Sequence, residues 1–325
     1  MQIKQTITEF FPPKPTTTEA DLPSLAGKTY LITGGAAGIG KELARMLYSA
    51  NATVYIAGRS LSNIEKAKTE IMENPSQGMK VELSSGKILP LILDLSDLPT
   101  IKPAVQELER QVTTIDSVFL NAGVMTPPSG SKTTQGYELQ WGTNVVGHFL
   151  LQKLMMPLLQ ASAKQTGEAR IIWVASDGSN MSPSPDGIYW DDINGDKTGL
   201  RPWNLYAQSK AGNIILAAET ARRYGADNIA TASLNPGHLK TELQRHSNSY
   251  LAQLVGCALM YDARYGALTE LFVGFTDQVS TKNNGQYFLP WGRPGNMADH
   301  ILKGLENGSG NRLWELLDKE TARFS

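Results

Sequence analysis

Short apolar runs rich in β-branched residues alternate along this chain with longer segments whose apolar residues recur at helical spacing. Most of the short runs are apolar at nearly every position, which is typical of strands buried on both faces of a sheet. The alternation predicts an α/β fold, with a doubly wound parallel sheet of about seven strands and helices on both faces. The predicted strands are residues 29–33, 52–57, 88–93, 117–120, 170–175, 229–234 and 286–289.

Two stretches interrupt this alternation, residues 75–87 and 177–203, and both are rich in residues that favour turns. Long irregular stretches inside a compact domain usually carry function or move. Thr and Pro are frequent near the start, which predicts an irregular arm over residues 1–26. Because no composition break divides the remainder, we expect a single domain over residues 27–325 with an insertion at about 177–203.

Composition excludes several classes of protein. Of the 325 residues, 41% are hydrophobic, which is enough for a sizeable core. The 30 basic and 31 acidic side chains leave a formal charge of -1, so nothing attracts nucleic acid or an anionic membrane. The single cysteine, Cys257, excludes an internal disulfide framework and a cysteine-based metal cluster. Lacking a long apolar run and a signal peptide, the chain is expected to be soluble, cytoplasmic and free of metal.

A glycine-rich turn, TGGAAGIG, runs from Thr33 to Gly40 between the first predicted strand and the first predicted helix. Glycines allow a tight turn and let backbone amides approach a pyrophosphate, while the start of a helix adds partial positive charge. Gly34, Gly38 and Gly40 fit that task. The turn alone is weak evidence, but its placement favours dinucleotide binding.

A second motif, LYAQSKAG, places Tyr206 and Lys210 four residues apart on a predicted helix. This spacing brings both side chains to one face. A nearby ammonium favours the phenolate, so Lys210 is expected to lower the pKa of Tyr206 toward the range of a working acid or base. An ordinary solvated pair on a helix surface is the alternative.

The glycine spacing is GxxxGxG rather than the commoner GxGxxG, and it resembles the TGxxxGxG signature of short-chain dehydrogenases/reductases. The resemblance covers about residues 27 to 292 and implies a Rossmann-type fold. Further motifs follow in the family's order: Asp94 in LDL, NAG at 121–123, Asn144 in WGTNVVGHF, Ser176 in VASDGS, and Pro236, Gly237 and Thr241 in NPGHLKT.

The resemblance implies a catalytic set of four residues. Tyr206 would be the general acid/base, Lys210 would hold the nicotinamide ribose, and Ser176 would orient the substrate oxygen. Asn144 would hold a water that connects Lys210 to solvent. The implied cofactor contacts are Gly34, Ala37, Gly38, Ile39, Gly40, Arg59, Ser60, Asp94, Leu95, Asn121, Ala122, Gly123, Tyr206, Lys210, Pro236, Gly237, His238 and Thr241.

The end of the second predicted strand favours NADP(H) over NAD(H). A carboxylate there would bind the ribose hydroxyls and repel a 2′-phosphate, but the sequence reads IAGRS. Arg59 can pair with a phosphate, and Ser60 can add a hydroxyl. The alternative is that Arg59 stacks on adenine and permits either cofactor.

The segment between Ser176 and Tyr206, which are 30 residues apart, is longer than in many members of the family and resembles retinol-dehydrogenase-like and fungal members. We expect hydride transfer between NADP(H) and a hydrophobic, uncharged carbonyl compound or alcohol, plausibly a secondary metabolite. The alternative is that the same fold catalyses isomerisation or cyclisation. A nucleotide-sensing protein is a third class, but it would predict a damaged Tyr/Lys pair, and both residues are present. A homo-oligomer is common in the family and stays open.

The loops after the fourth, fifth and sixth strands are expected to line the substrate pocket. Most of their residues are apolar or aromatic, although the aromatic ones could instead pack the insertion onto the domain. His148 is expected to pack in the interior, and the orientation of His238 is left open. The loop residues are Val124, Met125, Pro127, Pro128, Met181, Tyr189, Trp190, Trp203, His238, Leu239 and Leu243.

Overall fold

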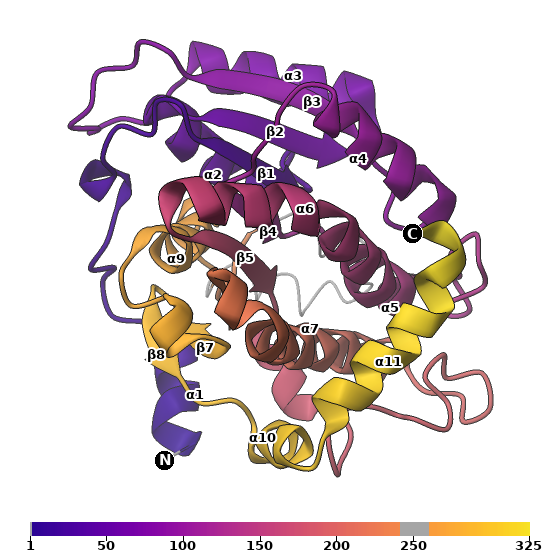
Figure 1. The fold of residues 1–325 in the computed structure, drawn as a ribbon. Helices are drawn as coiled ribbons and strands as arrows, with labels where there is room; N and C mark the ends of the chain where they lie inside the picture. The colour runs from indigo at the N-terminus through magenta and orange to yellow at the C-terminus, as the bar shows by residue number, and fades with distance from the viewer. Residues whose placement is uncertain (1, 241–259) are drawn as a thin grey trace.

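An eight-stranded sheet crosses the molecule in the order β3-β2-β1-β4-β5-β6-β7-β8 (Figure 1). The computed structural model describes residues 2–240 and 260–325. Neighbouring strands are parallel throughout, except that β8 runs antiparallel to β7. The strands are β1 Thr29–Thr33, β2 Thr53–Gly58, β3 Lys87–Ile92, β4 Ser117–Leu120, β5 Ala169–Val174, β6 Ile229–Leu234, β7 Gln286–Leu289 and β8 Arg293–Gly295.

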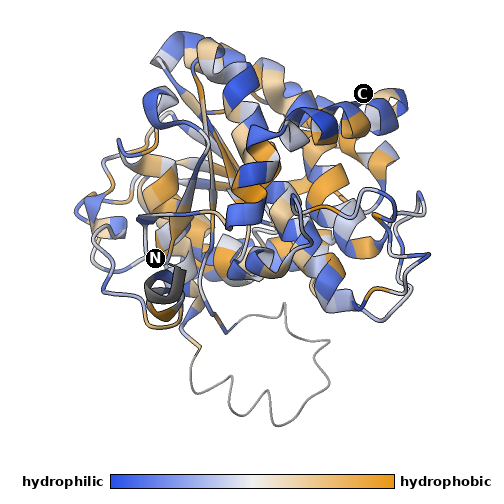
Figure 2. Ribbon diagram, turned by 90° about the horizontal axis from the view of Figure 1, so that it is seen from below, coloured by the Kyte–Doolittle hydropathy of each residue, from blue (hydrophilic) through white to orange (hydrophobic). Residues whose placement is uncertain are grey.

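Helices cover both faces of the sheet and bury one core on each. On one face lie α2 (Gly38–Ser49), α3 (Leu61–Glu73) and α9 (Ala263–Phe275). On the other lie α4 (Ile101–Glu109), α6 (His148–Thr166), α7 (Pro202–Tyr224) and α11 (Ser309–Thr321). The strands are hydrophobic in the middle of the molecule and the helices turn polar faces outward (Figure 2). The near-continuous apolar strands therefore predict this layering correctly.

Shorter elements complete the chain. The remaining α-helices are α1 Gln2–Phe10, α5 Leu139–Trp141 and α10 Asp299–Glu306, and a π-helical segment η3 spans Gly142–Gly147. The 3-10 helices are η1 Glu19–Asp21, η2 Leu98–Thr100, η4 Asp177–Met181, η5 Gly225–Asp227, η7 Thr281–Asn283 and η8 Ala322–Phe324.

The predicted α/β sheet is confirmed, with one strand more than expected. All seven predicted strands are present: four have the predicted ends, and β2, β3 and β5 are shifted by one residue. The addition is β8, which contains only Arg, Pro and Gly and therefore carries no strand signal in the sequence. Its pairing follows from the tight reversal of the chain after β7, where Gly292 N donates to Leu289 O over 2.9 Å.

The prediction of an irregular arm over residues 1–26 is wrong for its first part, because Gln2–Phe10 forms α1. This helix lies beside β8 in Figure 1. Gln5 exchanges two hydrogen bonds with the Asn296 backbone, each 3.0 Å long, and Arg293 donates to Thr8 O over 2.9 Å. Tertiary contacts thus stabilise a helix too short to persist alone.

The insertion at 177–203 begins with η4 and continues as turns up to α7. Gln208 of α7 holds it in place: its side chain accepts from Tyr189 N over 2.7 Å and donates to Ile193 O over 2.8 Å. The insertion is therefore attached to the helix that carries the Tyr/Lys motif.

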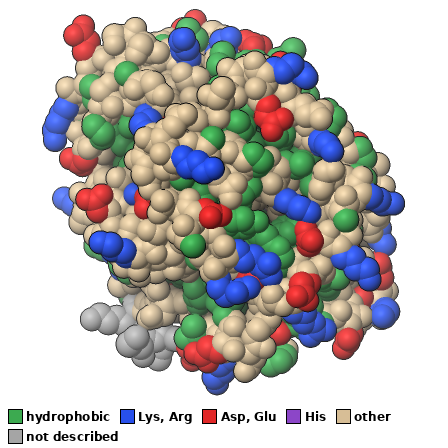
Figure 3. Space-filling view, in the orientation of Figure 1, with side chains coloured by type: hydrophobic (Ala, Val, Ile, Leu, Met, Phe, Trp, Pro, Cys, Tyr) green, Lys and Arg blue, Asp and Glu red, His purple; other side chains and the backbone are tan. Residues whose placement is uncertain are grey.

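The surface in the view of Figure 3 carries basic and acidic side chains interspersed, without a patch of one sign. Among the described helices, none combines the length and the apolar character that a membrane span requires. Thr241, Leu243 and Cys257 lie outside the described residues, so the expectations for them are not tested.

Candidate active site and cofactor cleft

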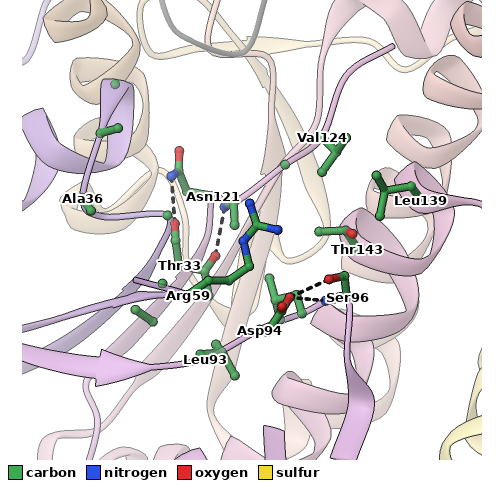
Figure 4. A pocket seen from close by; sticks show the side chains of 18 of the residues that line it. Thr33, Ala36, Arg59, Leu93, Asp94, Ser96, Asn121, Val124, Leu139 and Thr143 are labelled. Atoms are coloured by element: carbon green, nitrogen blue, oxygen red, sulfur yellow. Dashed lines mark hydrogen bonds between the residues drawn. The ribbon is translucent and has the colours of Figure 1, made fainter. Parts of the chain in front are cut away.

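A cleft of about 520 Å³ opens at the carboxyl ends of β1, β2, β3 and β4 (Figure 4). β1 and β4 are neighbours, and the chain leaves them for opposite edges of the sheet. Ligands of open parallel sheets bind at such a switch point. The predicted cofactor residues that line the cleft are Gly34, Ala37, Gly38, Ile39, Arg59, Asp94, Leu95, Asn121, Ala122 and Gly123.

The first βα turn has the backbone that a pyrophosphate site needs. Gly34 and Gly38 have φ angles of +69° and +53°, which a side chain would disfavour. The N-cap of α2 is Ala37, whose side chain makes no capping hydrogen bond, so the first amides of the helix are left for a ligand. The turn therefore fits a dinucleotide phosphate.

Gly40 serves packing rather than direct contact, since it does not line the cleft. A Cβ there would lie 2.6 Å from Asn121 Nδ2 and 2.8 Å from Gly34 O. Asn121 in turn donates to Thr33 O over 2.8 Å and so joins β4 to the end of β1. The third glycine of the motif thus lets α2 approach this junction.

His148 links the phosphate turn to the catalytic asparagine. Its Nε2 lies 2.9 Å from Thr33 Oγ1, and its Nδ1 lies 3.1 Å from the backbone oxygen of Asn144. Burial lowers the pKa of His148 to about 3, so the ring is neutral. Because a carbonyl oxygen only accepts, Nδ1 carries the proton and Nε2 accepts from Thr33. His148 packs in the interior, as expected.

The far end of the cleft carries Arg59 and Asp94. The Arg59 side chain reaches into the cleft in Figure 4, and no described carboxylate pairs with it. Asp94 accepts from the Ser96 amide and hydroxyl over 2.8 and 2.6 Å. Ser60 does not line the cleft; it caps α3 by accepting from Asn63 N over 3.3 Å. Ser96 lines the cleft without having been singled out in the sequence, and the cofactor contact of Ser60 stays a prediction.

The cleft is also lined by residues that the sequence did not assign to the cofactor: Ala36, Val124, Pro127, Pro128, Ser131, Leu139 and Thr143. Val124, Pro127 and Pro128 were expected to face substrate, because the sequence places them after the fourth strand without showing how the loop turns. Ala36 belongs to the glycine-rich turn and Thr143 to the WGTNVVGHF motif, whereas no motif marks Ser131 and Leu139.

Asn144 is fully buried in the π-helical segment η3, an irregularity that often marks functional sites. Its side chain accepts from Val124 N over 2.8 Å and donates to Val124 O and Ser209 Oγ, both over 3.0 Å. Gly123, which lines the cleft, touches this group: a Cβ on it would lie 3.5 Å from Asn144 Oδ1 and 3.6 Å from Lys210 Nζ. Gly123 therefore lies between the cleft and the predicted catalytic residues Asn144 and Lys210, which do not themselves line it.

Tyr206 and Lys210 lie on α7 as the spacing predicts, and both are buried. Lys210 Nζ donates to Val174 O over 2.9 Å and lies 5.7 Å from the centre of the Tyr206 ring. Burial lowers the pKa of Lys210 to about 8. Burial also raises the pKa of Tyr206, with a smaller contribution from Asp177. The expected lowering by Lys210 is therefore absent in this arrangement, because the ammonium is bound to the end of β5.

Ser176 follows β5 and lies beside the Tyr206 ring. A Cβ on Gly178 would touch Tyr206 Cε1 at 3.2 Å and Ser176 Oγ at 3.4 Å, and Ser176 works to lower the pKa of Tyr206 against the larger effect of burial. The structure therefore brings together all four predicted catalytic residues: Asn144, Ser176, Tyr206 and Lys210.

The PG segment after β6 lies on the substrate side of this group. Gly237 has a φ of +91°, and a Cβ there would meet the Trp291 ring at 2.7 Å. Its amide donates to Asn235 Oδ1 over 2.9 Å. His238 turns toward η4, where Nε2 lies 3.2 Å from Asp177 Oδ2. Pro236, Gly237 and His238 do not line the cleft, so their cofactor contacts stay a prediction.

Comparison with known proteins agrees with this geometry. The model of a family described as short chain dehydrogenase matches residues 28–189. A short-chain dehydrogenase/reductase of Armillaria gallica is 39% identical over 315 residues, which cover 96% of each chain. The chain belongs to the short-chain dehydrogenase/reductase family. Another member, from Phomopsis amygdali, is 38% identical over an alignment of 336 residues that covers 99% of this chain and 98% of the relative.

Solved structures show the same fold. An uncharacterised protein from Mycobacterium paratuberculosis is 27% identical, with a TM-score of 0.70, over 93% of this chain and 97% of the other. The RhlG/NADP active-site complex from Pseudomonas aeruginosa is 23% identical, with a TM-score of 0.62, over 82% and 95%. This short-chain dehydrogenase/reductase is therefore an NAD(P)(H)-dependent oxidoreductase that acts on a small molecule.

Aromatic residues of the insertion divide into two groups in this dehydrogenase/reductase. Trp190 packs against the core, donates to Asp186 Oδ2 over 2.7 Å and stacks on Arg312. Trp203 lies 5.4 Å from the Tyr206 ring centre, and its indole donates to Met181 Sδ over 3.2 Å. Trp203 thus packs beside Tyr206 at the start of α7, while Trp190 holds the insertion onto the domain.

Proposed function

We propose that this protein transfers a hydride between NADP(H) and a hydrophobic, uncharged carbonyl compound or its alcohol. The observation that carries the proposal is the buried Tyr206–Lys210 pair on α7 with Ser176 beside it, together with a cleft at the strand ends where Arg59 has no carboxylate partner among the described residues. The nicotinamide, when bound, supplies or accepts the hydride.

The residues present suit proton transfer to a carbonyl oxygen. Because burial raises the pKa of Tyr206, its hydroxyl keeps its proton at neutral pH and can donate it. Lys210 has a pKa of about 8, so it can gain or lose a proton near neutral pH. Asn144 fixes the Val124 backbone from both sides and so shapes the wall beside the reacting atoms.

Arg59 supports NADP(H) as the cofactor. Its guanidinium faces the cleft without a described carboxylate partner, and a 2′-phosphate would supply the missing anion. Asp94 does not compete for it, since its carboxylate binds Ser96.

The exposed side chains around Tyr206 support a hydrophobic substrate. Met181 is 60% exposed and Trp203 is 39% exposed, and Trp203 contacts both Met181 and the Tyr206 ring. Large apolar side chains left in solvent beside a catalytic group commonly cover an apolar ligand. A secondary metabolite with a ketone, aldehyde or secondary alcohol fits this surface.

The test is oxidation of NADPH by the purified protein with a panel of carbonyl compounds. We expect turnover of aromatic or polycyclic carbonyls, and a lower kcat/KM for small keto acids and sugar phosphates. Preference for the anionic compounds would contradict the substrate class. Mass spectrometry of the products separates reduction, which adds two hydrogens, from isomerisation or cyclisation, which leaves the mass unchanged.

A further inference from the structure

Four charged side chains meet at the substrate end of the site, and each comes from a different part of the chain. Asp177 begins η4, His238 follows β6, Glu9 lies near the end of α1, and Arg293 begins β8. The charges of His238 and Arg293 both work to lower the pKa of the Glu9 carboxyl, and Glu9 is only 2% exposed. The hydride transfer proposed above uses none of the four.

Asp177 determines where the proton of the Ser176 hydroxyl points. A carboxylate only accepts, so in the 3.0 Å contact between Ser176 Oγ and Asp177 Oδ1 the serine is the donor. Ser176 Oγ in turn accepts from Gly178 N over 3.1 Å. A hydroxyl has one proton and two lone pairs, so Ser176 Oγ has one lone pair left, and toward the neighbouring Tyr206 hydroxyl it can act only as an acceptor.

We propose that Asp177 is a positioning residue of this enzyme. It accepts the hydrogen bond of the Ser176 hydroxyl and so turns a serine lone pair toward Tyr206, with His238 as its counterion. This inference rests on the function proposed above. It assigns the first residue of the insertion to the catalytic arrangement, where the motifs of the sequence assign nothing.

His238 is held for this task by the N-terminal helix. The Phe10 ring of α1 stacks on the imidazole, with ring centres 4.2 Å apart and planes at 18°. Nε2 of the imidazole lies 3.2 Å from Asp177 Oδ2, and the two form an ion pair when His238 is protonated. Docking of α1 on β8 therefore keeps the counterion of Asp177 in place.

Charges around the pair support this arrangement. Burial works to raise the pKa of Asp177, but His238, Ser176 and the Gly178 amide hold it below its usual range. Asp177 raises the pKa of His238, and Glu9 adds to this effect.

Further groups face the pair from other elements. Tyr287 of β7 lies near both Asp177 and Glu9, Tyr206 faces Asp177 from α7, and Arg293 faces Glu9 from β8. The Asp177 charge opposes ionisation of Tyr206, so loss of the charge favours the phenolate.

Two substitutions separate position from charge. Asp177→Asn keeps an oxygen acceptor for Ser176 and removes the charge, whereas Asp177→Ala removes both. We expect Asp177→Ala to lower kcat by about tenfold or more, since a hydrogen bond to a charged group is lost. Asp177→Asn should retain most of kcat, while the alkaline limb of the pH profile of kcat/KM moves to lower pH. His238→Gln should leave that limb in place, because the imidazole is neutral at the pH where Tyr206 ionises, and should change activity only at lower pH, where the protonated imidazole pairs with Asp177.

Wild type and Asp196→Asn, which changes an exposed carboxylate of the same insertion paired with Lys132, serve as controls for each assay. NADPH affinity and the melting temperature of each variant report on folding. If Asp177→Ala does not fold, Asp177→Asn and His238→Gln carry the test. The inference is overturned if both Asp177 variants lose activity equally with an unmoved pH profile, or if neither differs from wild type. An inactive wild type would instead contradict the proposed function.

Discussion

Thr33 Oγ1 donates to His148 Nε2 over 2.9 Å and accepts from Ala122 N over 2.9 Å. One threonine hydroxyl therefore joins the end of β1, the segment after β4 and the start of α6. Through Nδ1 of His148 the chain of hydrogen bonds continues to Asn144. The order of donors and acceptors is fixed, because His148 is neutral and a carbonyl oxygen only accepts.

Thr33→Val should therefore destabilise the protein more than its size suggests. The substitution keeps the shape but leaves the Ala122 amide and His148 Nε2 without partners, at a cost of about 2 kcal/mol or more in the free energy of unfolding. Chemical denaturation of both proteins measures the difference. Thr231→Val is the matched control, since the Thr231 hydroxyl is buried in β6 without a hydrogen bond to a described residue. An equal loss in both variants would contradict the role given to Thr33.

Tyr206→Phe removes only the hydroxyl that is the proposed acid/base. We expect kcat to fall by about 10²-fold or more, while NADPH affinity and the melting temperature stay near those of wild type. Steady-state kinetics with NADPH titration measures both quantities. The control is Tyr55→Phe on β2, which removes a hydroxyl that donates to Gln111 Oε1 over 3.1 Å. It should leave kcat unchanged. Turnover of Tyr206→Phe within a few-fold of wild type would exclude the proposed acid/base role.

The parts of this fold that the sequence predicts are those determined locally or by burial. β5 and β6 read as apolar runs because both of their faces are covered. The glycine turn could be predicted because Gly34 and Gly38 adopt backbone angles that other residues avoid. The YxxxK spacing likewise fixes a shared helix face without reference to the rest of the molecule.

The parts that the sequence did not predict depend on contacts between distant segments. α1 is stabilised by Asn296 and Arg293, which follow it by more than 280 residues. The position of Asp177 against His238 likewise joins η4 to the segment after β6. The charge state of Tyr206 depends on burial rather than on the spacing to Lys210, and burial is a property of the assembled fold. Pairing of this kind leaves no periodic signal in a single sequence.

Arg59→Asp should weaken NADPH binding far more than NADH binding. The change replaces a cation that faces the cleft by an anion, so only the cofactor with a 2′-phosphate loses a charge-assisted contact. Such a contact is worth about 1.5 to 3 kcal/mol, which corresponds to about a ten- to hundredfold loss in affinity. Calorimetric titration with each cofactor measures the loss.

Arg110→Asp is the charge-matched control for that measurement, since Arg110 pairs with Glu107 and does not line the cleft. It should change neither affinity. An equal loss of NADPH and NADH affinity in Arg59→Asp would mean that Arg59 contacts adenine instead of a phosphate.

Glu9 should make the docking of α1 depend on pH. Burial raises the pKa of Glu9 to about 7, and the negative charge of Asp177 adds to this shift. A carboxyl whose pKa is higher in the folded protein stabilises it fully below the unfolded value of 4.5, and this stabilisation is lost as pH rises toward 7. From about pH 5 to pH 8 the docked helix should therefore lose up to about 3 kcal/mol.

Hydrogen exchange of the α1 amides at several pH values measures that loss. In wild type we expect protection to fall between pH 5 and pH 8 beyond the intrinsic dependence of exchange on pH. Glu9→Gln should flatten this change, because a neutral amide replaces the carboxyl at the same place beside Gln5. Glu65→Gln, at an exposed ion pair with Lys68 on α3, should behave as wild type. The same pH dependence in Glu9→Gln as in wild type would exclude Glu9 as its cause and point to His238, whose imidazole stacks on Phe10 of α1.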